Sequence, residues 1–199
     1  MPEQQQTQGG TSMNGLELGG SGSSPADGGG SGGGEYVTFS LNAELYAFDA
    51  LKVQEIIELT TVTKVPHLPG HLKGVINLRG TIIPVVDLKQ KFAMEGAGAY
   101  RKHTCIIVTE FSAGVMGLIV DTVSDIMYLP ASSISPPPDF GARIRSDFIA
   151  GMARSGEGLI LLLDVDKVLT AEEQTVAEQL AEQPAPAALE GTAADAGSP

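Results

Sequence analysis

The chain has 199 residues, of which 12 are basic and 24 acidic, and its formal net charge is −12. Residues 1–34 carry −3, residues 171–199 carry −6 and residues 35–170 carry the remaining −3. The sequence has no basic stripe, which argues against nucleic acid as a partner. No segment approaches 18 apolar residues, so we expect no membrane-spanning helix.

Composition divides the chain into three parts. Residues 1–34 contain 12 of the 25 glycines, and they lack aromatic and basic residues, as do residues 171–199. All ten Phe and Tyr residues lie between Tyr36 and Phe148. We therefore predict a disordered Gly/Ser-rich tail over 1–34, a folded body over 35–170, and an acidic Ala/Glu/Pro-rich tail over 171–199 that is partly helical at its start. The N-terminus shows no basic n-region or apolar h-region, so we expect no signal peptide.

The first predicted elements are a hairpin and a short helix. Alternation of apolar residues over Glu35–Leu41 predicts a half-buried strand, and Leu45–Phe48 returns as a second strand. Asp49 is a candidate N-cap for a helix or helical turn over Ala50–Ile57, because the apolar residues there fall near helical spacing. Thr60–Val65 is rich in β-branched residues and stops at a proline.

The most informative run is Gly74–Leu88, in which two β-branched stretches flank Asn77-Leu78-Arg79-Gly80. This pattern predicts strand, turn, strand, with Arg79 at or beside the bend. Arg79 is the only charged residue between Lys73 and Asp87. From spacing alone it is either a solvated turn residue or an anchor whose rigid guanidinium meets a partner.

The second half of the chain continues with short strands. A linker is expected over 121–125, a helix over Asp164–Leu169, and a capping box at Thr170-Ala171-Glu172-Glu173 that starts a fraying helix to about Gln183. The strands are predicted over Thr104–Phe111, Val115–Val120, Ile126–Leu129, Phe148–Ala153 and Leu159–Leu163. About ten short strands with frequent turn signals predict a mainly β protein made of small antiparallel barrels or a sandwich.

No motif in the sequence supports catalysis or metal binding. His67 and His71 are four residues apart, but a proline and a glycine intervene and no third ligand is near. Asp164 and Asp166 resemble the start of a calcium loop without its glycine, so a helix N-terminus is the better interpretation. The single cysteine, Cys105, lies in an apolar strand and is interpreted as a small buried hydrophobe. We predict no catalytic, cofactor or metal site, and an interaction module explains the pattern better than an enzyme.

Several blocks of the sequence resemble the CheW family of bacterial chemotaxis coupling proteins. The resemblance spans residues 35–170 in order and without large gaps. It is carried by Tyr46–Asp49 with Leu51–Ile56, Gly74–Leu88 with Asn77-Leu78-Arg79-Gly80, Gly117–Asp125, Phe148–Gly151 and Leu161–Leu169.

This resemblance implies two intertwined five-stranded SH3-like barrels, short helices and a non-enzymatic adaptor without a cofactor. It implies that the adaptor couples the cytoplasmic tip of methyl-accepting chemotaxis receptors to the regulatory domain of the histidine kinase CheA. Such a protein is cytoplasmic, lies at receptor arrays and associates with the membrane only through receptors. Carried over by motif, the receptor interface consists of Val53, Glu55, Asn77, Leu78 and Arg79. The kinase interface contains Phe140, which follows the Pro-rich connection.

Two alternatives to this function remain open from the sequence. One is a coupling protein of a chemosensory-like pathway with a non-flagellar output. The other is a small-molecule-binding or enzymatic β-barrel, which would require a deep polar pocket with convergent titratable groups.

Overall fold

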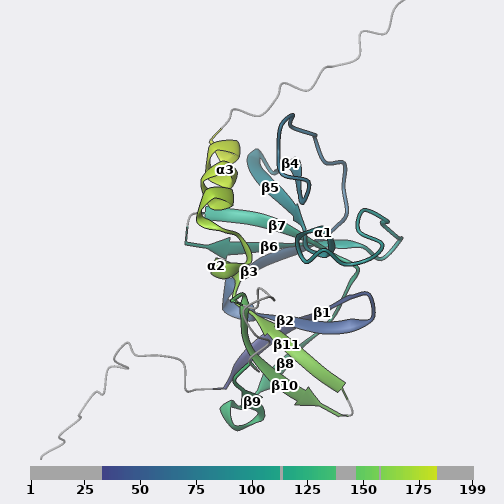
Figure 1. The fold of residues 1–199 in the computed structure, drawn as a ribbon, viewed down its shortest axis with the longest axis vertical. Helices are drawn as coiled ribbons and strands as arrows, with labels where there is room; N and C mark the ends of the chain where they lie inside the picture. The colour runs from purple at the N-terminus through teal and green to yellow at the C-terminus, as the bar shows by residue number, and fades with distance from the viewer. Residues whose placement is uncertain (1–32, 113, 138–146, 157, 183–199) are drawn as a thin grey trace, which may run out of the picture. The chain divides into compact units, whose positions relative to one another are not determined.

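The computed structural model describes residues 33–112, 114–137, 147–156 and 158–182, and Figure 1 shows their fold. Within these residues the chain forms eleven strands, three short α-helices and two single turns of 3-10 helix. The mainly β fold class is therefore confirmed. Most of the two predicted tails, together with Phe140, lies outside the described residues.

The first and last parts of the described chain build a six-stranded sheet. Its strand order is β8-β1-β2-β11-β10-β9, in which β2 and β11 are parallel and the other neighbours antiparallel. The strands are β1 (Gly34–Leu41), β2 (Glu44–Asp49), β8 (Thr122–Leu129), β9 (Ile134–Ser135), β10 (Ile149–Ser155) and β11 (Gly158–Leu163).

The middle of the chain builds a five-stranded sheet of order β3-β6-β7-β5-β4. The chain begins in the first of the two sheets, builds the second and returns to the first. The two sheets contain six and five strands rather than five each. The strands of this second sheet are β3 (Val53–Glu58), β4 (Leu72–Leu78), β5 (Thr81–Asp87), β6 (Cys105–Phe111) and β7 (Gly114–Val120).

The predicted helix over Ala50–Ile57 is wrong for most of its length. Asp49 does act as an N-cap, since its carboxylate accepts a hydrogen bond from the Leu51 N–H at 2.9 Å. The helix that it caps is only the 3-10 turn η1 (Ala50–Lys52), after which the chain continues as β3. Partly buried and exposed residues alternate along β3, which pairs with β6. The apolar spacing fits both periods over so short a run, and pairing with β6 selects the extended one.

The predicted linker over 121–125 is also wrong, because Asp121 alone separates β7 from β8. The polar residues that resembled a linker pair with two polar residues of β1, the buried Thr38 and the partly buried Ser40. Ser40 Oγ lies 2.7 Å from Thr122 Oγ1, and Thr38 Oγ1 donates to the Asp125 carbonyl at 2.8 Å. The β-prone segment 60–65 forms only one isolated bridge, between Thr63 and Val75.

The largest apolar cluster draws on both sheets. Phe39 and Phe48 of the six-stranded sheet stack at 4.8 Å between ring centroids and share this cluster with Ile107 and Leu118 of the five-stranded sheet. Phe92 and Phe148, which pack on its margin, stack at 4.5 Å. Burial of this shared core holds the two sheets in one folded unit.

The helices lie at the ends of strands or on the sheet surface. Two are single turns, α1 (Leu88–Lys91) and α2 (Val165–Val168), and α3 spans Ala171–Ala181. The capping box predicted at Thr170 and Glu173 is confirmed. Figure 1 shows α3 beside β5, and its residues Ala177 and Leu180 are buried. None of the helices in the described ranges is long and apolar enough to cross a membrane.

Candidate functional site

The hairpin of β4 and β5 presents Arg79 at its tip. Arg79 and Gly80 form the two-residue turn and have φ values of +54° and +91°. Positive φ at both central positions is the mark of a type I′ turn, which suits a hairpin because its twist matches that of the flanking strands. Asn77 supports the turn, since its Oδ1 accepts a hydrogen bond from the Gly80 N–H at 2.8 Å. The predicted strand, turn, strand is therefore confirmed, and its turn consists of Arg79 and Gly80.

Arg79 is in contact with a second predicted site residue. Its Nη2 donates to Glu55 Oε1 at 2.7 Å, although the side chain of Arg79 is 77% exposed and that of Glu55 is 29% exposed. Glu55 belongs to β3 and Arg79 follows β4, and these are the two edge strands of the five-stranded sheet. The sheet therefore curls until its opposite edges come within the reach of one side-chain pair.

The other predicted interface residues differ in exposure. Asn77 is exposed beside the turn. Val53 and Leu78 are partly buried, Val53 against the cluster shared by both sheets and Leu78 against a cluster within the five-stranded sheet. The structure thus brings Glu55 and Arg79 into contact and places Asn77 in the same hairpin end as Arg79, whereas Val53 and Leu78 pack against apolar clusters.

Leu51 is an exposed apolar residue that the sequence analysis did not assign to the site. It lies on η1, two residues before Val53, and is 92% exposed. The helix predicted for this segment placed Leu51 on a buried stripe. Leu51 is exposed because it lies in η1, before β3 begins, and no local pattern in the sequence indicated this.

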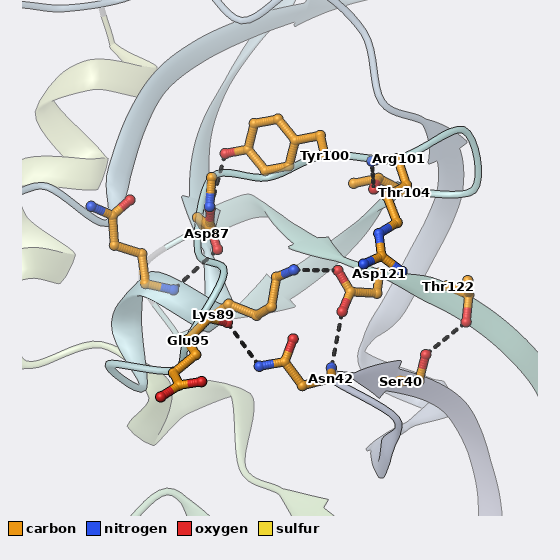
Figure 2. Close-up of polar contacts among 12 residues, drawn as sticks. Ser40, Asn42, Asp87, Lys89, Glu95, Tyr100, Arg101, Thr104, Asp121 and Thr122 are labelled. Carbon is orange, nitrogen blue, oxygen red and sulfur yellow. Dashed lines mark hydrogen bonds and ion pairs between the residues drawn. The ribbon is translucent and has the colours of Figure 1, made fainter.

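A polar cluster lies where α1 meets the connection to β6 (Figure 2). Asp87 is fully buried, and its carboxylate accepts hydrogen bonds from the Tyr100 hydroxyl at 3.0 Å and from the N–H groups of Gly98 and Gln90 at 3.2 Å and 3.1 Å. Burial, together with the charge and hydrogen bond of Asp87, raises the pKa of Tyr100. Through Gly98 and Tyr100, Asp87 therefore holds the connection between α1 and β6 against the start of α1.

The same cluster contains a buried ion pair, in which Lys89 Nζ lies 2.6 Å from Asp121 Oδ1. The second carboxylate oxygen of Asp121 accepts from the Asn42 N–H at 2.9 Å, and Asn42 Nδ2 donates to the Glu95 carbonyl at 2.8 Å. These contacts join α1, the β1–β2 turn and the crossing between the sheets (Figure 2). The charged groups satisfy one another, which is the arrangement expected of a structural clamp.

A third polar group attaches α3 to the end of α1 and to the segment just before β4. Glu173 Oε1 lies 2.8 Å from His71 Nε2, and Glu173 Oε2 pairs with Lys91 Nζ and accepts from the Thr170 N–H at 2.8 Å. Burial lowers the pKa of His71, although Glu173 acts in the opposite direction. Burial would raise the pKa of Glu173, but the bonds from Lys91 and Thr170 outweigh it and hold that pKa below its usual value. The sequence indicated the local capping role of Glu173 and gave no signal for its distant partners.

A surface pocket of about 310 Å³ lies among β3, β6 and β8. It is lined by Glu58, Lys102, His103, Thr104, Cys105, Thr122 and Val123. Within the described ranges, no group of three or more His, Cys, Asp or Glu side chains is placed to hold a metal ion.

The candidate site is an exposed, charged hairpin tip on a curled sheet, and the buried polar groups nearby are paired. In comparison with known families, residues 35–173 match the CheW-like domain. The chain belongs to the CheW-like family and is a chemotaxis scaffold or adaptor protein, so the resemblance seen in the sequence is confirmed.

Individual relatives match over most of their own length. The chemotaxis protein CheW of Klebsiella aerogenes is 40% identical over 147 residues, covering 74% of this chain and 88% of that protein. The CheW of Rhizobium meliloti is 34% identical and covers 73% and 94%. The crystal structure of the scaffolding protein TtCheW from Thermoanaerobacter tengcongensis superposes with a TM-score of 0.65 at 35% identity, covering 71% of this chain and 90% of that one.

Proposed function

We propose that this chain is a non-enzymatic adaptor that couples the cytoplasmic tip of methyl-accepting chemotaxis receptors to the regulatory domain of the kinase CheA. It acts in the cytoplasm, at receptor arrays, and needs no cofactor. Membership of the CheW-like family and the similarity to a scaffolding protein support this proposal.

The observation that carries the receptor contact is the presentation of Arg79. Its guanidinium stands at the tip of a tight hairpin, is largely exposed, and forms an ion pair with Glu55. Exposed ion pairs contribute little to stability, typically about 0–1 kcal/mol, so exchange of Glu55 for a partner's carboxylate or carbonyl costs little. Arginine is also among the residues that most often anchor interfaces. We therefore assign Glu55, Asn77 and Arg79 to direct receptor contact, with Val53 and Leu78 at the margin of the same surface.

The kinase contact is assigned to a separate region. Phe140 follows the Pro-rich connection after β9, and an aromatic side chain there suits an interface anchor. Receptor and kinase contacts on separate surfaces would allow both partners to be bound at once, which a coupling protein requires.

Co-sedimentation with receptor-containing membranes, with and without kinase, tests the proposal. We expect the wild-type protein to pellet with receptor membranes and to increase the amount of kinase in the pellet. Arg79→Ala should reduce its own sedimentation. Phe140→Ala should sediment normally but bring down less kinase. Lys102→Ala, which removes an exposed charge elsewhere, is the control. Sedimentation of the wild-type protein that does not depend on receptor would refute the proposal.

A further inference from the structure

The outer face of the β4–β5 hairpin is covered by the chain's own helix α3. Val75 of β4 and Ile82 of β5 are buried in one small cluster with Leu180 of α3, and Val176 packs against them. Figure 1 shows α3 lying along this hairpin. This face is therefore a surface that accepts a helix, and in this structure α3 is its occupant.

The covered face adjoins the candidate receptor site. Asn77 pairs directly with Ile82 across the hairpin, and paired residues of an antiparallel ladder point to the same side. Val75 precedes Asn77 by two residues and shares its face. Asn77 is exposed whereas Val75 and Ile82 lie under α3. Removal of α3 would therefore extend the exposed surface at Asn77 by two branched aliphatic side chains.

The attachment of α3 is concentrated in a few residues. Of its eleven residues, only Ala177 and Leu180 are fully buried. The groups that face Glu173 are the ammonium of Lys91, at the end of α1, and the imidazole of His71, just before β4. A helix of this length is marginal in isolation, so α3 is expected to lose its helical structure when it detaches.

We propose that the outer face of the β4–β5 hairpin is a helix-docking surface, which α3 occupies in cis and a partner helix occupies when α3 detaches. The partner helix carries a carboxylate followed at i+3, i+4 and i+7 by small or aliphatic residues, as Glu173, Val176, Ala177 and Leu180 do in α3. The identity of the partner as a receptor helix rests on the proposed function. The surface itself does not.

Amide hydrogen exchange of the full-length chain tests whether α3 opens by itself. Glu173→Gln removes the charge that meets Lys91 and His71, and Glu172→Gln is the matched control, since Glu172 is its exposed neighbour in the same turn. We expect α3 amides to exchange at least about tenfold faster in Glu173→Gln, while amides of β6 and β7 keep their rates. The control should behave as wild type. If the α3 amides exchange only as slowly as the core amides in both the wild-type and the Glu173→Gln chain, α3 does not open by itself and the proposal is overturned.

Two binding measurements test the docking surface. A labelled peptide of residues 170–182 should bind the Glu173→Gln chain saturably. It should bind the wild-type chain at least about fivefold more weakly, because α3 occupies the docking surface in most wild-type molecules and only the remainder can bind the peptide. Failure of the peptide to bind the Glu173→Gln chain would overturn the proposal that this face is a docking surface. A receptor cytoplasmic fragment should likewise bind Glu173→Gln several-fold more tightly. If the peptide binds and the fragment binds neither protein, the proposed function fails and the docking surface stands. If the fragment binds both equally, the docking of a receptor helix on this surface is refuted.

Discussion

Arg79 and Glu55 form an ion pair of 2.7 Å between the two edge strands of one sheet. The pair closes the curl of the five-stranded sheet at the end where the β4–β5 hairpin turns. It also holds the guanidinium in one place at that tip, although the side chain remains largely exposed. A positioned and exposed arginine of this kind can meet a partner without first losing much side-chain entropy.

Substitution of Arg79 should separate binding from stability. Arg79→Ala is expected to change the free energy of unfolding by less than about 1 kcal/mol, because the ion pair is exposed. The same change should weaken binding of a receptor fragment by about 1–3 kcal/mol, as loss of an interface anchor does. Urea denaturation and a binding titration measure the two quantities. Lys102→Ala should alter neither, and unchanged receptor affinity in Arg79→Ala would remove this residue from the interface.

Gly74 should tolerate no side chain. Its φ is +131°, and a Cβ atom there would lie 2.0 Å from the Thr63 carbonyl oxygen. Thr63 and Val75 exchange two backbone hydrogen bonds at 2.8 Å and 2.9 Å, so the clash would separate a paired segment. Gly74→Ala is expected to destabilise the fold by about 2–4 kcal/mol.

Gly96 is the matched control for Gly74. It also has a positive φ, +70°, but a Cβ atom there would have no heavy atom within 4 Å. Gly96→Ala should therefore cost only the backbone strain, about 1–2 kcal/mol. Equal losses of unfolding free energy in the two variants would show that the contact with Thr63 contributes nothing.

Features that depend on residues close together in the sequence could be predicted from it, whereas features that depend on contacts between distant segments could not. Alternation over Glu35–Leu41 and the run Gly74–Leu88 were sufficient for three strands and a turn, because strand period and turn chemistry are local. The helix predicted after Asp49 was wrong, because the apolar spacing there fits both helix and strand and only pairing with β6 decides between them.

In the candidate site, too, local patterns could be predicted from the sequence and long-range contacts could not. The capping box at Glu173 is a local pattern and was predicted, whereas its contacts with His71 and Lys91 join residues far apart in the chain. The pair of Glu55 and Arg79 depends on the curl of a whole sheet. The family resemblance placed both residues in one interface, but no spacing rule places them in contact.

The buried pair of Lys89 and Asp121 should matter more for stability than an exposed one. The Lys89 side chain is only 7% exposed, and Lys89→Met leaves the Asp121 carboxylate without its counter-charge. We expect a loss of about 2–3 kcal/mol, below the range for fully buried pairs because Asp121 retains some contact with water. Lys167→Met is the control, since Lys167 pairs with Asp164 while 59% exposed, and it should cost less than about 1 kcal/mol. Similar losses of unfolding free energy in urea would contradict a role for burial.

Acidification should lower the stability of the fold, first through His71 and then through Glu173. Burial lowers the pKa of His71 in the folded protein below its ordinary 6.5, so the unfolded chain binds this proton more readily. The corresponding stability is complete above about pH 6.5 and is lost as the pH falls through the folded pKa. The pKa of Glu173 is held below its ordinary 4.5, chiefly by Lys91 and Thr170 acting against burial. Its contribution is present above about pH 4.5 and is lost at still lower pH.

The unfolding free energy measured between about pH 7.5 and pH 5 isolates the first of these two steps. Wild-type protein should lose stability over this interval, and His71→Gln, which cannot gain the proton, should lose less of it. His103→Gln alters an exposed histidine and should follow the wild-type slope. Identical pH slopes for wild type and His71→Gln would show that protonation of His71 is not coupled to the fold.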